Sequence, residues 1–107
     1  MSKIKAIIKR PDEEYGHIAN ISCTLENLQE IVGGHIETIH LGQDLILIMN
    51  EEGKLLGLGP NFRLEHGSFA DVIVGTAIVV GQKEDDFGDC PIVFEAWKIL
   101  LKLWGNE

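Results

Sequence analysis

The sequence predicts one α+β domain with a mainly antiparallel sheet, formed by a β-hairpin, a short helix, a strand meander and a C-terminal amphipathic helix. Three observations predict it. Short alternating apolar runs open the chain, two continuous aliphatic runs lie in its middle, and apolar side chains recur at helical spacing near its end. Since 107 residues suit a single hydrophobic core, we expect residues 1–107 to form one domain.

The first third of the chain predicts a hairpin and a helix. Residues 4–9 and 17–23 alternate as strands do, and the Pro-Asp pair at 11–12 has turn chemistry. Thr24 is a good N-cap for a helix with apolar residues at helical spacing, and the Gly-Gly pair at 33–34 ends it.

The middle of the chain predicts a strand meander. Residues 35–41 are rich in β-formers, and the aliphatic run at 45–49 is typical of a strand covered on both faces. The Asn-Glu-Glu-Gly segment at 50–53 predicts a tight turn, and residues 54–58 predict the returning strand of a hairpin.

The last third predicts one long strand and one helix. We expect a loop at 59–67, a strand at 71–81 and a polar acidic segment at 82–89. Gly75, inside the strand, indicates a bulge or a close backbone approach. Pro91 suits the first turn of a helix whose apolar face packs on the sheet or on a partner.

Charge and cysteine use narrow the function classes. The net charge of -8 disfavours direct nucleic-acid binding, because it repels the phosphate backbone. Cys23 and Cys90 form no paired motif, so we expect reduced thiols in the cytoplasm. The N-terminus lacks an export signal, and the longest apolar run is too short to cross a membrane.

No sequence pattern indicates a catalytic, metal or cofactor site. His35 and His40 have an odd spacing, which on a strand sends their side chains to opposite faces. The serines and cysteines lie in no nucleophile motif, and the glycines at 53–59 lack the lysine ending of a phosphate-binding loop. The sequence therefore favours a protein that is not an enzyme and needs no cofactor.

One stretch is rich in polar side chains, and we expect these to meet at one end of the sheet. The predicted ligand-binding residues are Asn50, Glu51, Lys54, Asn61, Arg63 and Asp71. Arg63 offers a planar fork for a carboxylate or phosphate, held by an acidic neighbour. The alternative is structural: the two asparagines serve turns, and Arg63 pairs with Asp71.

These segments also resemble the Domain of Unknown Function 3846 family, small proteins of Gram-positive gut bacteria, phages and mobile elements. The resemblance rests on Thr24-Leu25-Glu26-Asn27-Leu28-Gln29, Val32-Gly33-Gly34-His35-Ile36-Glu37, Asn50-Glu51-Glu52-Gly53-Lys54, Leu58-Gly59-Pro60-Asn61-Phe62-Arg63 and Asp71-Val72-Ile73-Val74-Gly75-Thr76. Gly59 departs from a usual proline. The resemblance implies a phage or plasmid setting but no activity.

Three functions remain open. The first is a non-catalytic accessory module that binds a small anionic ligand or a host protein at the 50–63 edge, with self-association through the terminal helix. The second is an acidic DNA mimic that inhibits a DNA-acting enzyme, suggested by Glu84, Asp85, Asp86 and Asp89. The third is an enzyme whose site assembles from distant residues such as Glu51, Arg63 and Asp71.

Overall fold

The computed structural model describes residues 3–106 and has a six-stranded antiparallel sheet as its central layer. The elements in chain order are β1 (Lys3–Lys9), β2 (His17–Ser22), α1 (Leu25–Val32), β3 (Ile36–His40), β4 (Leu45–Asn50), β5 (Pro60–His66), β6 (Phe69–Val74), β7 (Ala77–Lys83), β8 (Asp86–Gly88) and α2 (Phe94–Leu103). The sheet has the order β2-β1-β7-β4-β3, with β8 paired to β7, while β5 and β6 form a separate ribbon. The α+β class is confirmed.

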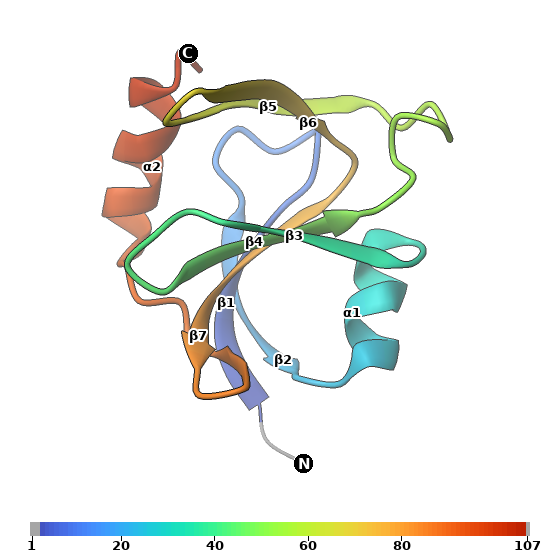
Figure 1. Cartoon of the computed structure of the whole chain (residues 1–107), viewed down its shortest axis with the longest axis vertical. Coiled ribbons are helices and arrows are strands. Elements are labelled where there is room, and N and C mark those ends of the chain that lie inside the picture. Colours follow the sequence, from blue (N-terminus) through green and yellow to red (C-terminus); the bar gives the residue numbers. More distant parts are fainter. Residues whose placement is uncertain (1–2, 107) are drawn as a thin grey trace.

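Each face of the central sheet carries its own hydrophobic core. Along β4 the odd-numbered Leu45, Leu47 and Met49 belong to one core and the even-numbered Ile46 and Ile48 to the other, as strand alternation requires. Helix α1 covers the even face, whereas the ribbon and α2 cover the odd face (Figure 1). This double covering explains the continuous aliphatic run.

The ends of α1 follow the chemistry predicted from the sequence. The Thr24 hydroxyl accepts a hydrogen bond from the Asn27 amide at 3.2 Å, which satisfies a free donor of the first turn. Gly33 ends the helix with φ of 83°, in the left-handed region where glycine is least strained.

Helix α2 packs against the sheet through its aromatic side chains. Trp97 is fully buried, and its indole N–H donates to the Tyr15 carbonyl at 2.9 Å. Its ring contacts Phe62 and Trp104 edge-on, with centroid separations of 5.6 and 5.8 Å. Pro91 does not open the helix as predicted, because it lies in the bend before the N-cap residue Val93.

The chain between β4 and β7 differs from the sequence-based expectation. Residues 51–57 are turns rather than the returning strand predicted at 54–58, and the predicted loop at 59–67 is largely strand β5. The strand predicted at 71–81 divides at Gly75 into β6 and β7, which belong to different sheets. The close approach is confirmed: Gly75 has φ of 75°, and a Cβ there would lie 2.7 Å from Leu58 Cδ1.

Two further findings apply to residues 3–106. No helix in this range is long and apolar enough to span a membrane. Cys23 and Cys90 are both free thiols.

Candidate functional site

A cavity of about 390 Å³ opens between the central sheet and the β5-β6 ribbon. Three segments line this pocket: strand β3, the end of β4 with the turn at 51–55, and strand β6. The pocket arises because β3 lies at the edge of the sheet, where the ribbon covers the odd face incompletely.

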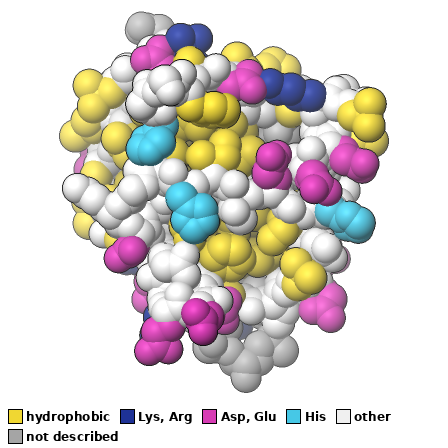
Figure 2. All heavy atoms as spheres, in the orientation of Figure 1, with side chains coloured by type: hydrophobic (Ala, Val, Ile, Leu, Met, Phe, Trp, Pro, Cys, Tyr) yellow, Lys and Arg dark blue, Asp and Glu magenta, His cyan; other side chains and the backbone are white. Residues whose placement is uncertain are grey.

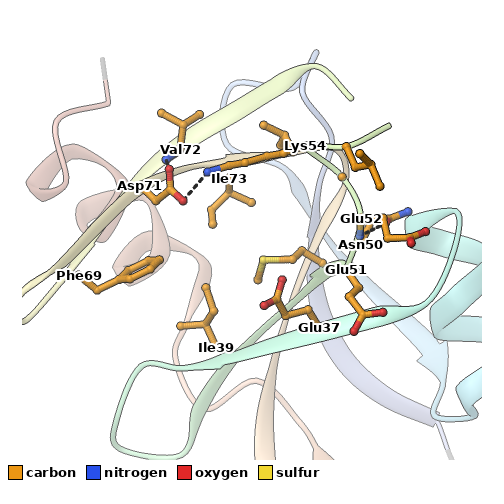
Figure 3. A pocket seen from close by; sticks show the side chains of 14 residues that line it. Glu37, Ile39, Asn50, Glu51, Glu52, Lys54, Phe69, Asp71, Val72 and Ile73 are labelled. Atoms are coloured by element: carbon orange, nitrogen blue, oxygen red, sulfur yellow. Dashed lines mark hydrogen bonds and ion pairs between the residues drawn. The ribbon is translucent and has the colours of Figure 1, made fainter. Parts of the chain in front are cut away.

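The floor of the pocket is apolar and its rim is acidic. The apolar side chains are Ile39, Met49, Leu55, Phe69, Val72, Ile73 and Val74, and the charged ones are Glu37, Glu51, Glu52, Lys54 and Asp71. Figure 3 shows the carboxylate of Glu37 directed into the pocket from β3 and Asp71 entering from the opposite wall, while Glu52 points away. Figure 2 shows hydrophobic side chains in the upper half of this face, with acidic side chains to their right.

One ion pair crosses the upper wall. The Lys54 ammonium donates to Asp71 Oδ2, and Asp71 Oδ1 accepts the Val72 amide at 2.7 Å. The hydrogen bond from Lys54, together with that from the Val72 amide, lowers the pKa of Asp71. The pair is solvent-exposed, so water and salt screen it and it contributes little to stability.

The pocket therefore carries an excess of negative charge. Lys54, the one Lys or Arg among the described residues that line the pocket, is already paired with Asp71. Neither Glu37 nor Glu51 forms an ion pair with any group in residues 3–106. A bound cation would gain Coulomb energy from both carboxylates, and a bound anion would lose it.

The structure divides the six sequence-predicted site residues into two groups. Asn50, Glu51, Lys54 and Asp71 line the pocket. Asn61 and Arg63 do not line it. Sequence reasoning missed Glu37. Its one signal is its register: Glu37 lies two residues before Ile39, so both side chains lie on the face of β3 that packs against the core.

Asn50 lines the pocket but has a structural role. It is only 5% exposed, its amide donates to the Val32 carbonyl at 3.1 Å, and its Oδ1 accepts the Glu52 amide at 2.7 Å. It thus ties the end of α1 to the turn that carries Glu51 and Lys54. This agrees with the alternative that Asn50 serves a turn.

Asn61 is likewise committed to the fold. Its amide donates to the Lys9 and Gly75 carbonyls at 2.7 and 2.8 Å, and its Oδ1 accepts the Lys9 ammonium at 2.7 Å. That ammonium also donates to the Glu13 carbonyl at 2.6 Å. Lys9 is only 3% exposed, and burial lowers its pKa.

Arg63 lies on the outer face of the ribbon. Its guanidinium donates to Glu65 Oε2 at 2.9 and 2.7 Å. Arg63 is opposite Val72 in the register, so the adjacent Asp71 has its side chain on the other face. The alternative pairing of Arg63 with Asp71 is therefore wrong, because Asp71 forms its ion pair with Lys54.

A second cavity of about 370 Å³ lies between α2 and the turn that joins β3 to β4. Its lining is mostly aliphatic and also includes Trp104 and His66. Nearby on α2, Ile99 and Leu103 are exposed. In contrast to the first pocket, this hollow brings no set of charged side chains together.

The fold and the pocket define a small α+β domain with a ligand-sized, acid-rimmed cavity. Residues 3–106 contain no group of three or more side chains arranged to hold a metal ion. The chain belongs to the family Domain of unknown function (DUF3846), whose sequence model matches residues 4–98. No curated protein and no solved structure matches the chain.

Proposed function

We propose that this protein is a non-catalytic binding module whose pocket holds a cationic group attached to an apolar body. The observation that supports it is the combination of an apolar floor with Glu37, Glu51 and Asp71 around one opening. Ligand pockets typically pair an apolar lining with a few placed polar groups. The volume of about 390 Å³ falls within the usual range of roughly 300–1,000 Å³.

The charge balance revises the anionic ligand expected from the sequence. That expectation depended on Arg63, which lies outside the pocket and pairs with Glu65. Lys54 alone would have to attract an anion past Glu37 and Glu51, while already bound to Asp71. A primary amine, a guanidinium or a host-protein segment bearing one suits the pocket better.

The two other candidate functions have weaker support. The lowered pKa of Asp71 keeps it ionised, which suits a charge partner better than a general acid. In the acidic segment, Asp86 and Asp89 accept the Phe87 and Lys5 amides at 2.7 and 2.8 Å. Both carboxylates are thus bonded to backbone amides of this chain, which favours a structural role over a row that imitates DNA phosphates.

The proposal includes the cellular setting expected from the family resemblance. This setting is an accessory role in a phage or mobile element; the two free cysteines support only its cytoplasmic part, since reduced thiols are usual there.

A thermal-shift screen with matched organic ions tests the proposal. Phenethylamine and 3-phenylpropionate share an aromatic body but differ in charge, and inorganic phosphate and nucleotides test the anionic expectation. At a hundredfold excess over its dissociation constant, a ligand adds about 2.7 kcal/mol to native stability. We expect stabilisation by the amine alone.

Two variants separate pocket binding from general charge effects. Glu37→Gln removes a pocket carboxylate and should weaken amine binding, whereas Arg63→Gln changes a charge on the outer face of the ribbon and should not. Preferential binding of the carboxylate or phosphate would contradict the proposal, as would amine binding that is unchanged in Glu37→Gln.

A further inference from the structure

Strand β3 forms one edge of the central sheet and borders the pocket. Among the strands of residues 3–106 it pairs with β4 alone, so its other side is unpaired in this range. In Figure 1 this strand runs across the front of the molecule. Glu37 and Ile39, on its odd register, line the pocket.

The register shows which backbone groups of β3 point to the free edge. His35 accepts the Glu51 amide at 2.8 Å, and Leu41 donates to the Leu45 carbonyl at 2.8 Å. In an antiparallel pair, hydrogen-bonded and non-hydrogen-bonded residues alternate. The odd residues of β3 therefore bond to β4, and the N–H and C=O groups of Ile36, Thr38 and His40 point outward.

The charge around this edge selects among partners. β3 contains no proline or lysine, two of the residues that commonly block strand addition. Glu37 is acidic and faces inward, so pairing with a second copy would bring two acid-rimmed pockets together on chains of charge -8 each. A basic partner would instead neutralise this charge.

We infer that an extended segment of a partner protein adds to β3 as an antiparallel strand and inserts a Lys or Arg side chain into the pocket. Side chains of adjacent strands share a face when directly opposite, so the basic residue lies opposite Glu37 and an apolar one opposite Ile39. We expect the antiparallel orientation because an antiparallel strand pair is slightly more stable than a parallel one. This inference rests on the proposed function and identifies its ligand as a peptide.

A synthetic peptide provides the direct test. The peptide Thr-Val-Thr-Lys-Thr, capped at both ends, matches the length of β3 and places its lysine opposite Glu37 and its valine opposite Ile39. Titration into labelled protein, followed by amide NMR, should shift Ile36, Thr38 and His40 and slow their hydrogen exchange. Moving the lysine by one position sends it to the other face and should abolish the pocket contact.

Backbone methylation of the peptide tests strand pairing without altering the protein. N-methylation of the central threonine removes the N–H opposite Thr38, so affinity should fall at least about tenfold, equivalent to one lost hydrogen bond. N-methylation of the lysine is the matched control, because its N–H points away from β3. Equal binding of both methylated peptides would overturn the inference.

Variants of the protein complete the test. Thr38→Pro removes an N–H that points to the free edge and leaves the hydrogen bonds to β4 intact. This variant should lose peptide binding but retain phenethylamine binding. Thr38→Val keeps the N–H and should bind both ligands. Glu37→Gln should weaken the peptide about fivefold, as expected for an exposed charge pair. Amine binding without peptide binding would overturn strand addition alone, and binding of neither would overturn the proposed function as well.

Discussion

Replacing Asn61 with leucine tests whether this residue serves the fold or a ligand. The side chain of Asn61 makes three hydrogen bonds, to the carbonyls of Lys9 and Gly75 and with the Lys9 ammonium. Leucine has a similar size but can make none of them. The substitution would leave two carbonyls without these donors and a buried ammonium with the Glu13 carbonyl as its remaining partner.

The expected loss of stability follows from these three bonds. Each amide-to-carbonyl bond contributes about 1 kcal/mol, and the bond from the Lys9 ammonium about 2 kcal/mol because one partner is charged. Asn61→Leu should therefore lower the free energy of unfolding by about 4 kcal/mol. A domain of this size has a total stability of roughly 5–15 kcal/mol, so the variant would be near its folding limit.

Urea unfolding followed by tryptophan fluorescence measures this loss, since Trp97 and Trp104 are buried. In a cycle with Lys9→Met, the double variant should lose about 2 kcal/mol less than the sum of the singles, because both remove the same bond. Arg63→Leu, on the outer face of the ribbon, should stay within about 0.5 kcal/mol of wild type. A loss below about 1 kcal/mol for Asn61→Leu, or additivity in the cycle, would refute this reasoning.

Three further predictions concern buried or constrained positions. Gly75→Ala should lower the free energy of unfolding more than Gly57→Ala does. Both glycines have positive φ, but only at Gly75 would the new Cβ meet a side chain, and urea unfolding of the two variants measures the difference. Burial lowers the pKa of Lys9, so between that pKa and 10.5 the unfolded chain binds more protons than the folded chain. Wild type should therefore gain stability over Lys9→Met as pH rises through this window. If the ammonium were solvated, its pKa would be unshifted, and pH-dependent unfolding of the two proteins would show no difference in slope there. Burial raises the pKa of the thiols of Cys23 and Cys90, so both should react slowly with an alkylating reagent at neutral pH, and the more buried Cys90 should react more slowly. Mass spectrometry of the native protein measures the two alkylation rates.

Much of the fold was predictable because its local signals agree with its tertiary contacts. The cap at Thr24, the stop at Gly33 and the aliphatic run of β4 each led to the correct element. The β1-β2 hairpin was also recognised, from the alternation of its strands and the turn chemistry of Pro11-Asp12. In these segments the residues that form the element also bury its apolar face.

The segment at 51–66 was misread for two physical reasons. The turn chemistry of Asn50 and Gly53 suggested a hairpin, but Leu55 and Leu56 are 82% and 57% exposed, so residues 54–58 have no buried face to hold a strand. In β5, Pro60 and the polar residues suggested a loop. The alternation of buried Phe62 and Leu64 with exposed neighbours was the signal that could have identified the strand.

The candidate site was predictable only in part, because its walls meet through tertiary structure. The turn at 50–53 was recognised, since its polar residues are adjacent in sequence. Glu37 and Asp71 come from strands of different sheets. No local pattern brings them together, so Glu37 could not be assigned to the site without the fold.

The position of the upper wall depends on residues outside the pocket. Strands β6 and β7 are nearly continuous in sequence, and the change of direction at Gly75 places Asp71 above β3. Gly75 is held on both sides, since its carbonyl accepts the Asn61 amide at 2.8 Å and its N–H donates to the Gly59 carbonyl at 2.8 Å. Asn61 thus positions the wall although it does not line the pocket. A polar residue expected at the site from its sequence neighbourhood therefore contributes to the geometry of the pocket rather than to its chemistry.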